Sequence, residues 1–215
     1  MKYDLLIFDL DGTILDTLED LKESTNYALT FHGYPARTLD EVRRFVGNGI
    51  GKLIERAVPS QTSAEETDRV LATFKRHYGK HCADHTKPYV GIEALLKKLR
   101  EKGCQTAIVS NKADFAVQEL KDQYFPGLFD FVVGEREGIR RKPCPDSVNE
   151  VLKTLDKTVT QAIYIGDSDV DIDTAKNAGM DVIGVSWGFR GRKFLEEHGA
   201  AKIADQPEDI WKFVE

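Results

Sequence analysis

Two carboxylates separated by one residue follow a short apolar run near the start of the chain. The sequence there is DLLIFDLDGT, in which Asp9 and Asp11 close the run and Gly12 follows them. Burying carboxylates is costly unless a counter-charge compensates. Clustered carboxylate oxygens are ligands that hard cations such as Mg²⁺ prefer. The pair therefore indicates chemistry that needs a metal ion.

Other groups suited to this chemistry follow later apolar runs. Ser110 and Asn111 end the run CQTAIVSN, and Asp167 and Asp171 lie in GDSDVDI. Lys142 precedes a proline in KPCP, which favours a loop just before a helix. A lysine and a hydroxyl beside a metal ion are typical ligands of phosphate. Together these residues predict phosphoryl transfer, with the metal and the lysine offsetting negative charge.

The elements that must position these groups alternate between strands and helices. Apolar runs at 4–8, 104–110, 129–133, 162–167 and 182–186 predict buried strands, and residues with helical spacing separate the later ones. This alternation predicts a doubly wound, Rossmann-like α/β core with a parallel sheet. Ligands of such sheets bind beyond the carboxyl ends of the strands, where the polar groups above would converge.

A helical module interrupts this alternation. Between residues 17 and 86 there is almost no strand signal, and Thr38 with Glu41 and Ser63 with Glu66 have the spacing of helix capping boxes. We therefore expect a catalytic core of residues 1–16 and 87–215, with residues 17–86 inserted as a helical cap. The cap is expected to close over the substrate and exclude water.

The two acids of DLDGT, Asp9 and Asp11, suit two different tasks. Carboxylates can form aspartyl-phosphate intermediates, which makes Asp9 the candidate nucleophile. Asp11, two positions on in an extended segment, points to the same side. It is the candidate that protonates the leaving oxygen and then activates water. Gly12 allows a sharp turn that brings backbone N–H groups close to the phosphate.

These residues resemble a known family. DLDGT at 9–13, a strand-ending Ser110, Lys142 in K-P-x-P and GDSDVDI at 166–172 are similar, in the same order, to the four motifs of the haloacid dehalogenase superfamily. The resemblance covers essentially the whole chain. It is greatest to the phosphoglycolate phosphatase-like branch, for which VGNG at 46–49 and SNK at 110–112 are typical.

The resemblance implies roles for individual residues. It implies that Asp9 is the nucleophile and Asp11 the general acid and base. It implies that Mg²⁺ is held by Asp9, the Asp11 carbonyl and Asp167, with Asp171 supporting the metal site or the lysine. The expected phosphate ligands are Ser110, Asn111, Lys142 and Gly12. Candidates for substrate specificity are Asn48, Lys52 and Arg190.

The expected substrate is a small phosphomonoester, with phosphoglycolate first. Relatives that cleave carbon–halogen bonds lack the second Asp of DxD, which this chain has as Asp11. A sugar-phosphate mutase, a pyrophosphatase and a non-catalytic binding protein on the same fold stay open as alternatives. The residues His77, His81, Cys82 and His85 have a spacing that leaves a zinc site open as well.

Composition excludes several other classes. The 215 residues carry a net charge of −6, which argues against a nucleic-acid-binding protein. No stretch approaches the roughly 20 apolar residues that span a bilayer, so no membrane partner is expected. Three cysteines, an odd number without paired spacing, make a disulfide framework improbable. We expect a cytoplasmic enzyme, monomeric or homodimeric, acting on a small phosphorylated molecule.

Overall fold

The structure, a computed structural model, describes residues 2–215 and divides into two units. The helical unit is Asp16–Lys87, and the α/β unit is the chain up to Leu15 and from Pro88 onward. The strands are β1 (Leu5–Phe8), β2 (Leu15–Asp16), β3 (Lys87–Pro88), β4 (Gln105–Ala113), β5 (Phe131–Glu135), β6 (Ala162–Gly166), β7 (Asp181–Val185) and β8 (Ile203–Ala204). The helices are α1 (Leu18–Phe31), α2 (Leu39–Phe45), α3 (Gly49–Ala57), α4 (Ala64–His81), α5 (Ile92–Glu101), α6 (Asp114–Tyr124), α7 (Asp146–Thr154), α8 (Asp169–Ala178), α9 (Gly191–Glu197) and α10 (Pro207–Val214), with a 3₁₀ turn at Val159–Gln161.

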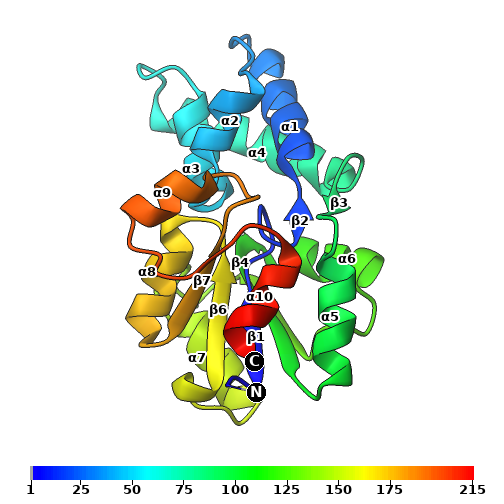
Figure 1. Ribbon diagram of the computed structural model, residues 1–215. Coiled ribbons are helices and arrows are strands. Elements are labelled where there is room, and N and C mark those ends of the chain that lie inside the picture. Colours follow the sequence, from blue (N-terminus) through cyan, green and yellow to red (C-terminus); the bar gives the residue numbers. More distant parts are fainter. Residues whose placement is uncertain (1) are drawn as a thin grey trace. The chain divides into compact units, whose positions relative to one another are not determined.

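The α/β unit is built on a six-stranded parallel sheet in the order β5-β4-β1-β6-β7-β8 (Figure 1). Strand β1 lies in its interior, with Leu5 paired to Gln105 of β4 and to Ala162 of β6. All four residues of β1 are fully buried, because both faces of a parallel sheet are covered by helices. The predicted doubly wound α/β core is confirmed. A separate two-stranded sheet is formed by β2 and β3.

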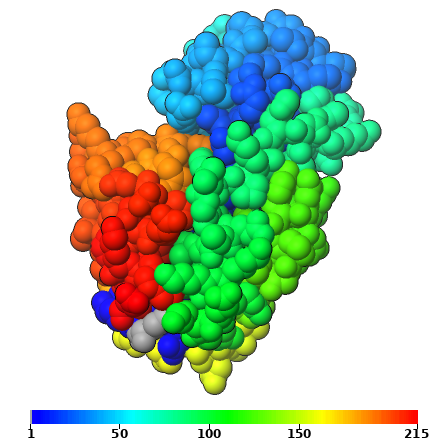
Figure 2. Space-filling model, turned by 45° about the vertical axis from the view of Figure 1, so that its right-hand side comes forward, coloured from blue at the N-terminus to red at the C-terminus, as the bar shows by residue number. Residues whose placement is uncertain are grey.

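Successive side chains of β1 pack on opposite faces of the sheet. Leu5 and Ile7 belong to a buried cluster that includes side chains of α7 and α8. Phe8, on the other face, has its ring 6.2 Å from that of Phe129, after α6. The C-terminal helix α10 packs against α5 (Figure 2), and Lys98 of α5 places its ammonium 4.1 Å from the Trp211 ring centroid. Helices packed on both faces of the sheet hold the strands in place, and the polar residues follow the ends of these strands.

The helical unit contains α1 to α4, and its two predicted capping boxes are confirmed. Thr38 Oγ1 accepts from the Glu41 N–H at 3.3 Å, and the Glu41 carboxylate accepts in return from the Thr38 N–H at 2.8 Å. Ser63 and Glu66 form the same reciprocal pair at the start of α4. Among the helices of residues 2–215, none combines the length and the apolarity that crossing a membrane requires.

A buried carboxylate joins the two ends of the helical unit. Asp20, in the first turn of α1, is 1% exposed and accepts from the His85 N–H at 2.9 Å, the Thr86 N–H at 2.8 Å and Thr86 Oγ1 at 2.7 Å. Hydrogen bonds to a charged acceptor contribute about 1.5–3 kcal/mol each, and unpaired buried donors are destabilising. We expect Asp20→Ala to lower the free energy of unfolding by about 3 kcal/mol, measured by urea unfolding.

A matched control is Asp68→Ala, because Asp68 is an exposed acid on α4. This control is expected to stay within about 0.5 kcal/mol of the wild type. Equal stability of the two variants would show that the Asp20 hydrogen bonds make no net contribution.

Candidate active site

Acidic residues meet a buried lysine at the carboxyl ends of β1 and β6. Asp9 follows β1 directly and Asp167 follows β6. Lys142, from the loop before α7, places its ammonium 2.9 Å from Asp9 Oδ1 and 2.8 Å from Asp171 Oδ1. One carboxylate oxygen from each of Asp9, Asp167 and Asp171 lies within 4.8 Å of the other two. The structure therefore brings together four of the residues singled out from the sequence.

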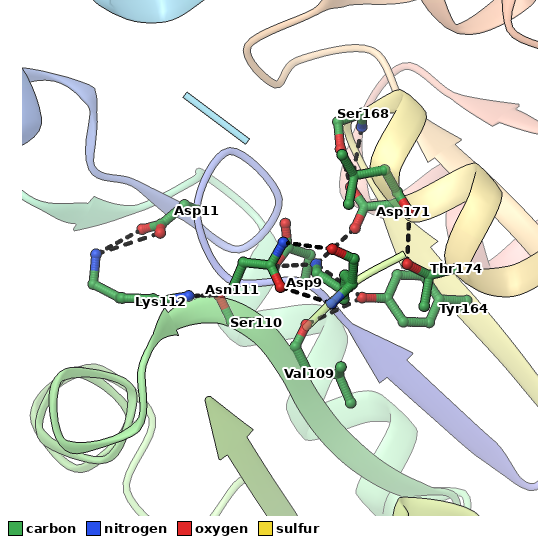
Figure 3. A network of polar contacts seen from close by, with 12 residues as sticks. Asp9, Asp11, Val109, Ser110, Asn111, Lys112, Tyr164, Ser168, Asp171 and Thr174 are labelled. Carbon is green, nitrogen blue, oxygen red and sulfur yellow. Dashed lines mark hydrogen bonds and ion pairs between the residues drawn. The ribbon is translucent and has the colours of Figure 1, made fainter. Parts of the chain in front are cut away.

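The two carboxylate oxygens of Asp171 bind different partners, of which Ser168 is labelled in Figure 3. Its Oδ1 binds Lys142, while its Oδ2 accepts from Ser168 N–H at 3.1 Å and from Ser168 Oγ at 2.7 Å. The second pair of bonds is a capping box at the start of α8. A Cβ at Gly166 would lie 2.3 Å from Asp171 Cγ, so glycine is required at the end of β6. Asp171 thus connects the start of α8 to the lysine.

Asp167 lies in a close-fitting backbone cradle. Its Oδ2 accepts from the Phe189 N–H at 2.6 Å. A Cβ at Gly12 would lie 2.5 Å from this oxygen, and a Cβ at Gly188 would lie 2.3 Å from Asp167 Cβ. Gly12 also has φ +82°, a conformation that favours glycine. The loop after β7 and the turn after β1 therefore fix the orientation of this carboxylate.

Lys142 is held through its backbone as well as its ammonium. Asn111 Oδ1 accepts from the Lys142 N–H at 2.9 Å, and Asn111 Nδ2 donates to the Lys142 carbonyl at 3.2 Å. The ammonium also donates to Tyr164 Oη at 3.1 Å, and this hydroxyl donates to the Val109 carbonyl at 3.0 Å. The lysine is 5% exposed. Its position is thus set from several directions before any substrate arrives.

Burial and mutual repulsion shift the pKa values of these groups. Burial raises the pKa of Asp9 to about 7, although Lys142 opposes that rise. Burial and the neighbouring Asp171 and Asp9 raise the pKa of Asp167 well above its ordinary value. Burial alone would lower the pKa of Lys142, but Asp171 and Asp9 outweigh it and raise that pKa well above 10.5. One lysine is therefore insufficient counter-charge for three buried carboxyl groups.

This donor set fits a divalent cation with hard oxygen ligands. Oxygens of Asp9, Asp167 and Asp171 lie close enough to hold one ion, but both Asp171 oxygens already bind Lys142 and Ser168, which leaves Asp9 and Asp167 as the carboxylate ligands. A cation at this cluster would favour the ionised forms of Asp9 and Asp167, whose pKa values burial and the neighbouring carboxylates raise. Mg²⁺ binds through one or two carboxylates and keeps several waters, which suits such a site.

We expect Mg²⁺ to stabilise the protein more at pH 8 than at pH 6. Between about pH 4 and 7 the metal-free native state keeps a proton on Asp9 that the unfolded chain has released, because the pKa of Asp9 is 3.8 ordinarily and about 7 in the fold. The contribution of this group to stability therefore falls as the pH rises through that window. A cation competes with that proton, so its effect grows with pH. Melting temperatures in EDTA and in Mg²⁺ at both pH values measure it.

Asp167→Asn is the control for this effect, because it removes one carboxylate of the cluster and is expected to reduce the Mg²⁺-dependent shift at both pH values. A shift in the wild type that is equal at pH 6 and pH 8 would contradict competition between the cation and a proton.

The other residues singled out from the sequence lie around this cluster. Ser110 is 6% exposed and its Oγ accepts from the Lys112 N–H at 3.2 Å. The expectation that Asp11 points to the same side as Asp9 is wrong, because the chain turns after β1 and is not extended there. Asp11 points away from Asp9 and toward Lys112 (Figure 3), with 3.0 Å between Lys112 Nζ and Asp11 Oδ1. The N–H of Gly12 donates to the Leu15 carbonyl at 2.9 Å, so the structure gives Gly12 a packing role beside Asp167.

The specificity candidates have partners within their own units. Lys52 pairs with Glu55 at 2.6 Å, and Asn48 Oδ1 accepts from Arg56 at 2.7 Å. Both pairs lie in the helical unit. Arg190, in the α/β unit, precedes α9 and lies over the Phe194 ring, and its charge acts to lower the pKa of Asp167. Their roles in substrate choice stay predictions.

The histidines of the helical unit have separate polar partners, although the rings of His77 and His81 stack with centroids 4.3 Å apart. His77 Nδ1 lies 3.0 Å from Ser24 Oγ, and His81 Nδ1 lies 2.8 Å from Asp84 Oδ2. His85 Nε2 lies 3.4 Å from Glu23. Within residues 2–215, the residues placed to share a metal ion are Asp9, Asp167 and Asp171 rather than these histidines.

Three features of the site were missed by sequence reasoning. They are Tyr164 beneath the Lys142 ammonium, the Phe189 N–H on Asp167, and Lys112 beside Asp11. Tyr164 lies within the apolar strand β6, so from the sequence it is expected to be an ordinary core side chain. No sequence signal marks Lys112 as a partner of Asp11, because the direction of its side chain depends on the irregular register between β4 and β5.

Comparison with known proteins agrees with this geometry. The sequence pattern of the family described as haloacid dehalogenase-like hydrolase matches residues 6–185. A phosphoglycolate phosphatase of Pseudomonas syringae pv. tomato is 34% identical over 94% of this chain and 76% of its own length. One of Mesorhizobium japonicum is 33% identical over 95% of this chain and 92% of its own length.

Solved structures show the same fold. A protein of Lactobacillus delbrueckii subsp. bulgaricus, provisionally assigned as a phosphoglycolate phosphatase, superposes with a TM-score of 0.96 at 42% identity, over 100% of this chain and 99% of that one. A predicted phosphoglycolate phosphatase of Haemophilus somnus has a TM-score of 0.93 at 27% identity, over 100% and 99% of the two chains.

The chain therefore belongs to the haloacid dehalogenase-like hydrolase family. Within that family it is phosphoglycolate phosphatase-like, and the resemblance stated from its motifs is confirmed.

Proposed function

We propose that the protein is a Mg²⁺-dependent phosphatase that hydrolyses a small phosphomonoester, phosphoglycolate first, through an aspartyl-phosphate on Asp9. The observation that carries the proposal is the contact of the Asp9 carboxylate with the buried Lys142 ammonium, at 2.9 Å, beside Asp167 and Asp171. A carboxylate held at the end of a strand next to fixed positive charge is suited to attack phosphorus. The names of the relatives support phosphoglycolate as the first substrate to test.

The residues of the chain divide the reaction between them. An Asp9 oxygen bonds to phosphorus while the ester P–O bond breaks, and Asp11 gives its proton to the leaving oxygen. Water then attacks phosphorus, its proton passes to Asp11, and the bond from phosphorus to the Asp9 oxygen breaks. Lys142 and Ser110 bind the phosphoryl oxygens, and Asp171 and Asn111 hold Lys142 in place. Asp9, Asp167 and the Asp11 carbonyl would hold Mg²⁺, which would supply positive charge to offset that of the phosphoryl group.

A panel of phosphate compounds tests this function. Phosphoglycolate, a hexose phosphate, pyrophosphate and 4-nitrophenyl phosphate are each incubated with the protein in Mg²⁺ and in EDTA, and released phosphate is measured. The proposal expects Mg²⁺-dependent release that is fastest with phosphoglycolate. Isomerisation of the hexose phosphate without phosphate release would show that the protein is a mutase. A preference for pyrophosphate would show that it is a pyrophosphatase. No turnover of any compound would favour a binding protein.

A further inference from the structure

A second buried lysine, which the mechanism above does not use, faces the second acid of the first motif. Lys112 Nζ lies 3.0 Å from Asp11 Oδ1 and 3.4 Å from Asp11 Oδ2. The Lys112 side chain is only 2% exposed, and that of Asp11 is 17% exposed. In Figure 3 the pair lies on the opposite side of Asn111 and Ser110 from Tyr164. Asp11 is therefore held by a different lysine from the one that holds Asp9.

The backbone around Lys112 departs from regular strand pairing. Val109 of β4 pairs with Val133 of β5, and Ala113 pairs with Glu135, so β4 carries extra residues between these two pairs. Such a bulge redirects side chains and is common beside active sites. Here it contains Lys112, whose ammonium it directs toward Asp11.

Two contacts hold this bulge in place. The Lys112 N–H donates to Ser110 Oγ at 3.2 Å, which ties the lysine to the expected phosphate-binding hydroxyl. On the other side, a Cβ at Gly134 would lie 2.5 Å from the Lys112 carbonyl oxygen and 2.6 Å from Asp114 Cα. Strand β5 therefore packs directly against the bulge, and the ammonium is presented from a rigid support.

Burying an ammonium is costly, and the ion pair with Asp11 compensates only if the geometry is kept. The Asp11 carboxylate is 17% exposed, so water could solvate its charge without a buried lysine. We propose that Lys112 is a positioning residue for Asp11: it holds the Asp11 carboxylate in the orientation from which it protonates the leaving oxygen and later deprotonates water. The inference rests on the proposed function. The proton that Asp11 gives up is replaced from water, and the Lys112 ammonium neither gains nor loses one.

Dependence on the leaving group separates this role from others. A 4-nitrophenolate departs without needing a proton, whereas an alkoxide needs the proton of Asp11. In Lys112→Met, which keeps chain length and removes charge, we expect kcat/KM to fall about 10- to 100-fold for phosphoglycolate and for ethyl phosphate. For 4-nitrophenyl phosphate it should fall less than about 3-fold. Retained activity on that ester also shows that the variant folds and that the phosphatase site is intact.

A conservative variant and a double variant sharpen the test. Lys112→Arg keeps the charge and is expected to recover a large part of the activity on alkyl esters. In an Asp11→Asn background, Lys112→Met should cause no further loss on them, because the residue acts through Asp11. The control Lys176→Met, at an exposed lysine of α8, should leave every rate unchanged.

Three outcomes would overturn the inference. Equal losses on alkyl and aryl esters would show that Lys112 acts on the phosphoryl group or on folding. A loss confined to phosphoglycolate, seen as a raised KM and absent with ethyl phosphate, would show that Lys112 binds the substrate carboxylate. A full further loss in the Asp11→Asn background would show that it acts independently of Asp11. If the wild type hydrolyses none of the esters, phosphoglycolate included, the proposed function itself fails.

Discussion

Asp9→Asn is expected to abolish phosphate release from phosphoglycolate in saturating Mg²⁺. The substitution keeps the size of the side chain but removes the carboxylate that we propose attacks phosphorus. Removing a nucleophile from a catalytic group that acts as a unit commonly lowers kcat by roughly 10⁴- to 10⁶-fold. Released phosphate measured over hours gives the residual rate. Acid quenching with radiolabelled substrate shows whether protein-bound phosphate, expected in the wild type, is missing in the variant.

The control for this experiment is Asp173→Asn, which removes an exposed acid from the same stretch of chain as Asp171. It should release phosphate at the rate of the wild type. Normal turnover by Asp9→Asn, in protein free of wild-type contamination, would refute Asp9 as the nucleophile while leaving the phosphatase activity standing.

Lys142→Met is expected to have the second-largest effect. The Lys142 ammonium lies within 3.1 Å of Asp9, Asp171 and Tyr164, and these contacts hold it at the place where we propose that the phosphoryl group binds. Loss of one such fixed positive group commonly costs about 3–4 kcal/mol of transition-state stabilisation, or roughly 10²- to 10³-fold in kcat. In contrast to Lys112→Met, the loss should be similar for alkyl and aryl esters, because the charge on the phosphoryl oxygens is common to both.

Stability must be measured beside the rate for this variant. Removing one partner of a buried ion pair is destabilising by about 3–5 kcal/mol. Here two buried carboxyl groups lose their ammonium, although protonation of Asp9 reduces the penalty. Rates are therefore compared well below both melting temperatures. A lowered melting temperature with unchanged kcat would show that Lys142 has only a structural role.

Much of this architecture could be predicted from the sequence because its signals are local. Apolar runs such as LLIF at 5–8, separated by helical spacing, indicate buried parallel strands, and the sheet has them. The meeting of Asp9, Lys142 and Asp167 follows from a general property of such sheets, whose strand ends share one edge. Residues distant in sequence could therefore be assigned to one site before their contacts were known.

What could not be predicted depends on exact distances between segments. The pairing of Lys112 with Asp11 requires the bulge in β4, and that bulge is visible only in the register between β4 and β5. The donor to Asp167 is a backbone N–H, that of Phe189, and every residue except proline offers one. The order of the strands in the sheet also depends on how the connecting helices cross its two faces. Residue type and spacing carry none of this information.

The interior place of β1 in the sheet has a consequence for synthesis on the ribosome. Its neighbours, β4 and β6, come after the whole of Asp16–Lys87 in the chain, so β1 emerges long before any strand that can pair with it. The helices of that segment make their contacts with one another over short separations and are able to form while the rest is still being made. Asp9, the proposed nucleophile, therefore emerges before the helical unit, but its site is assembled only when β4 and β6 follow that unit.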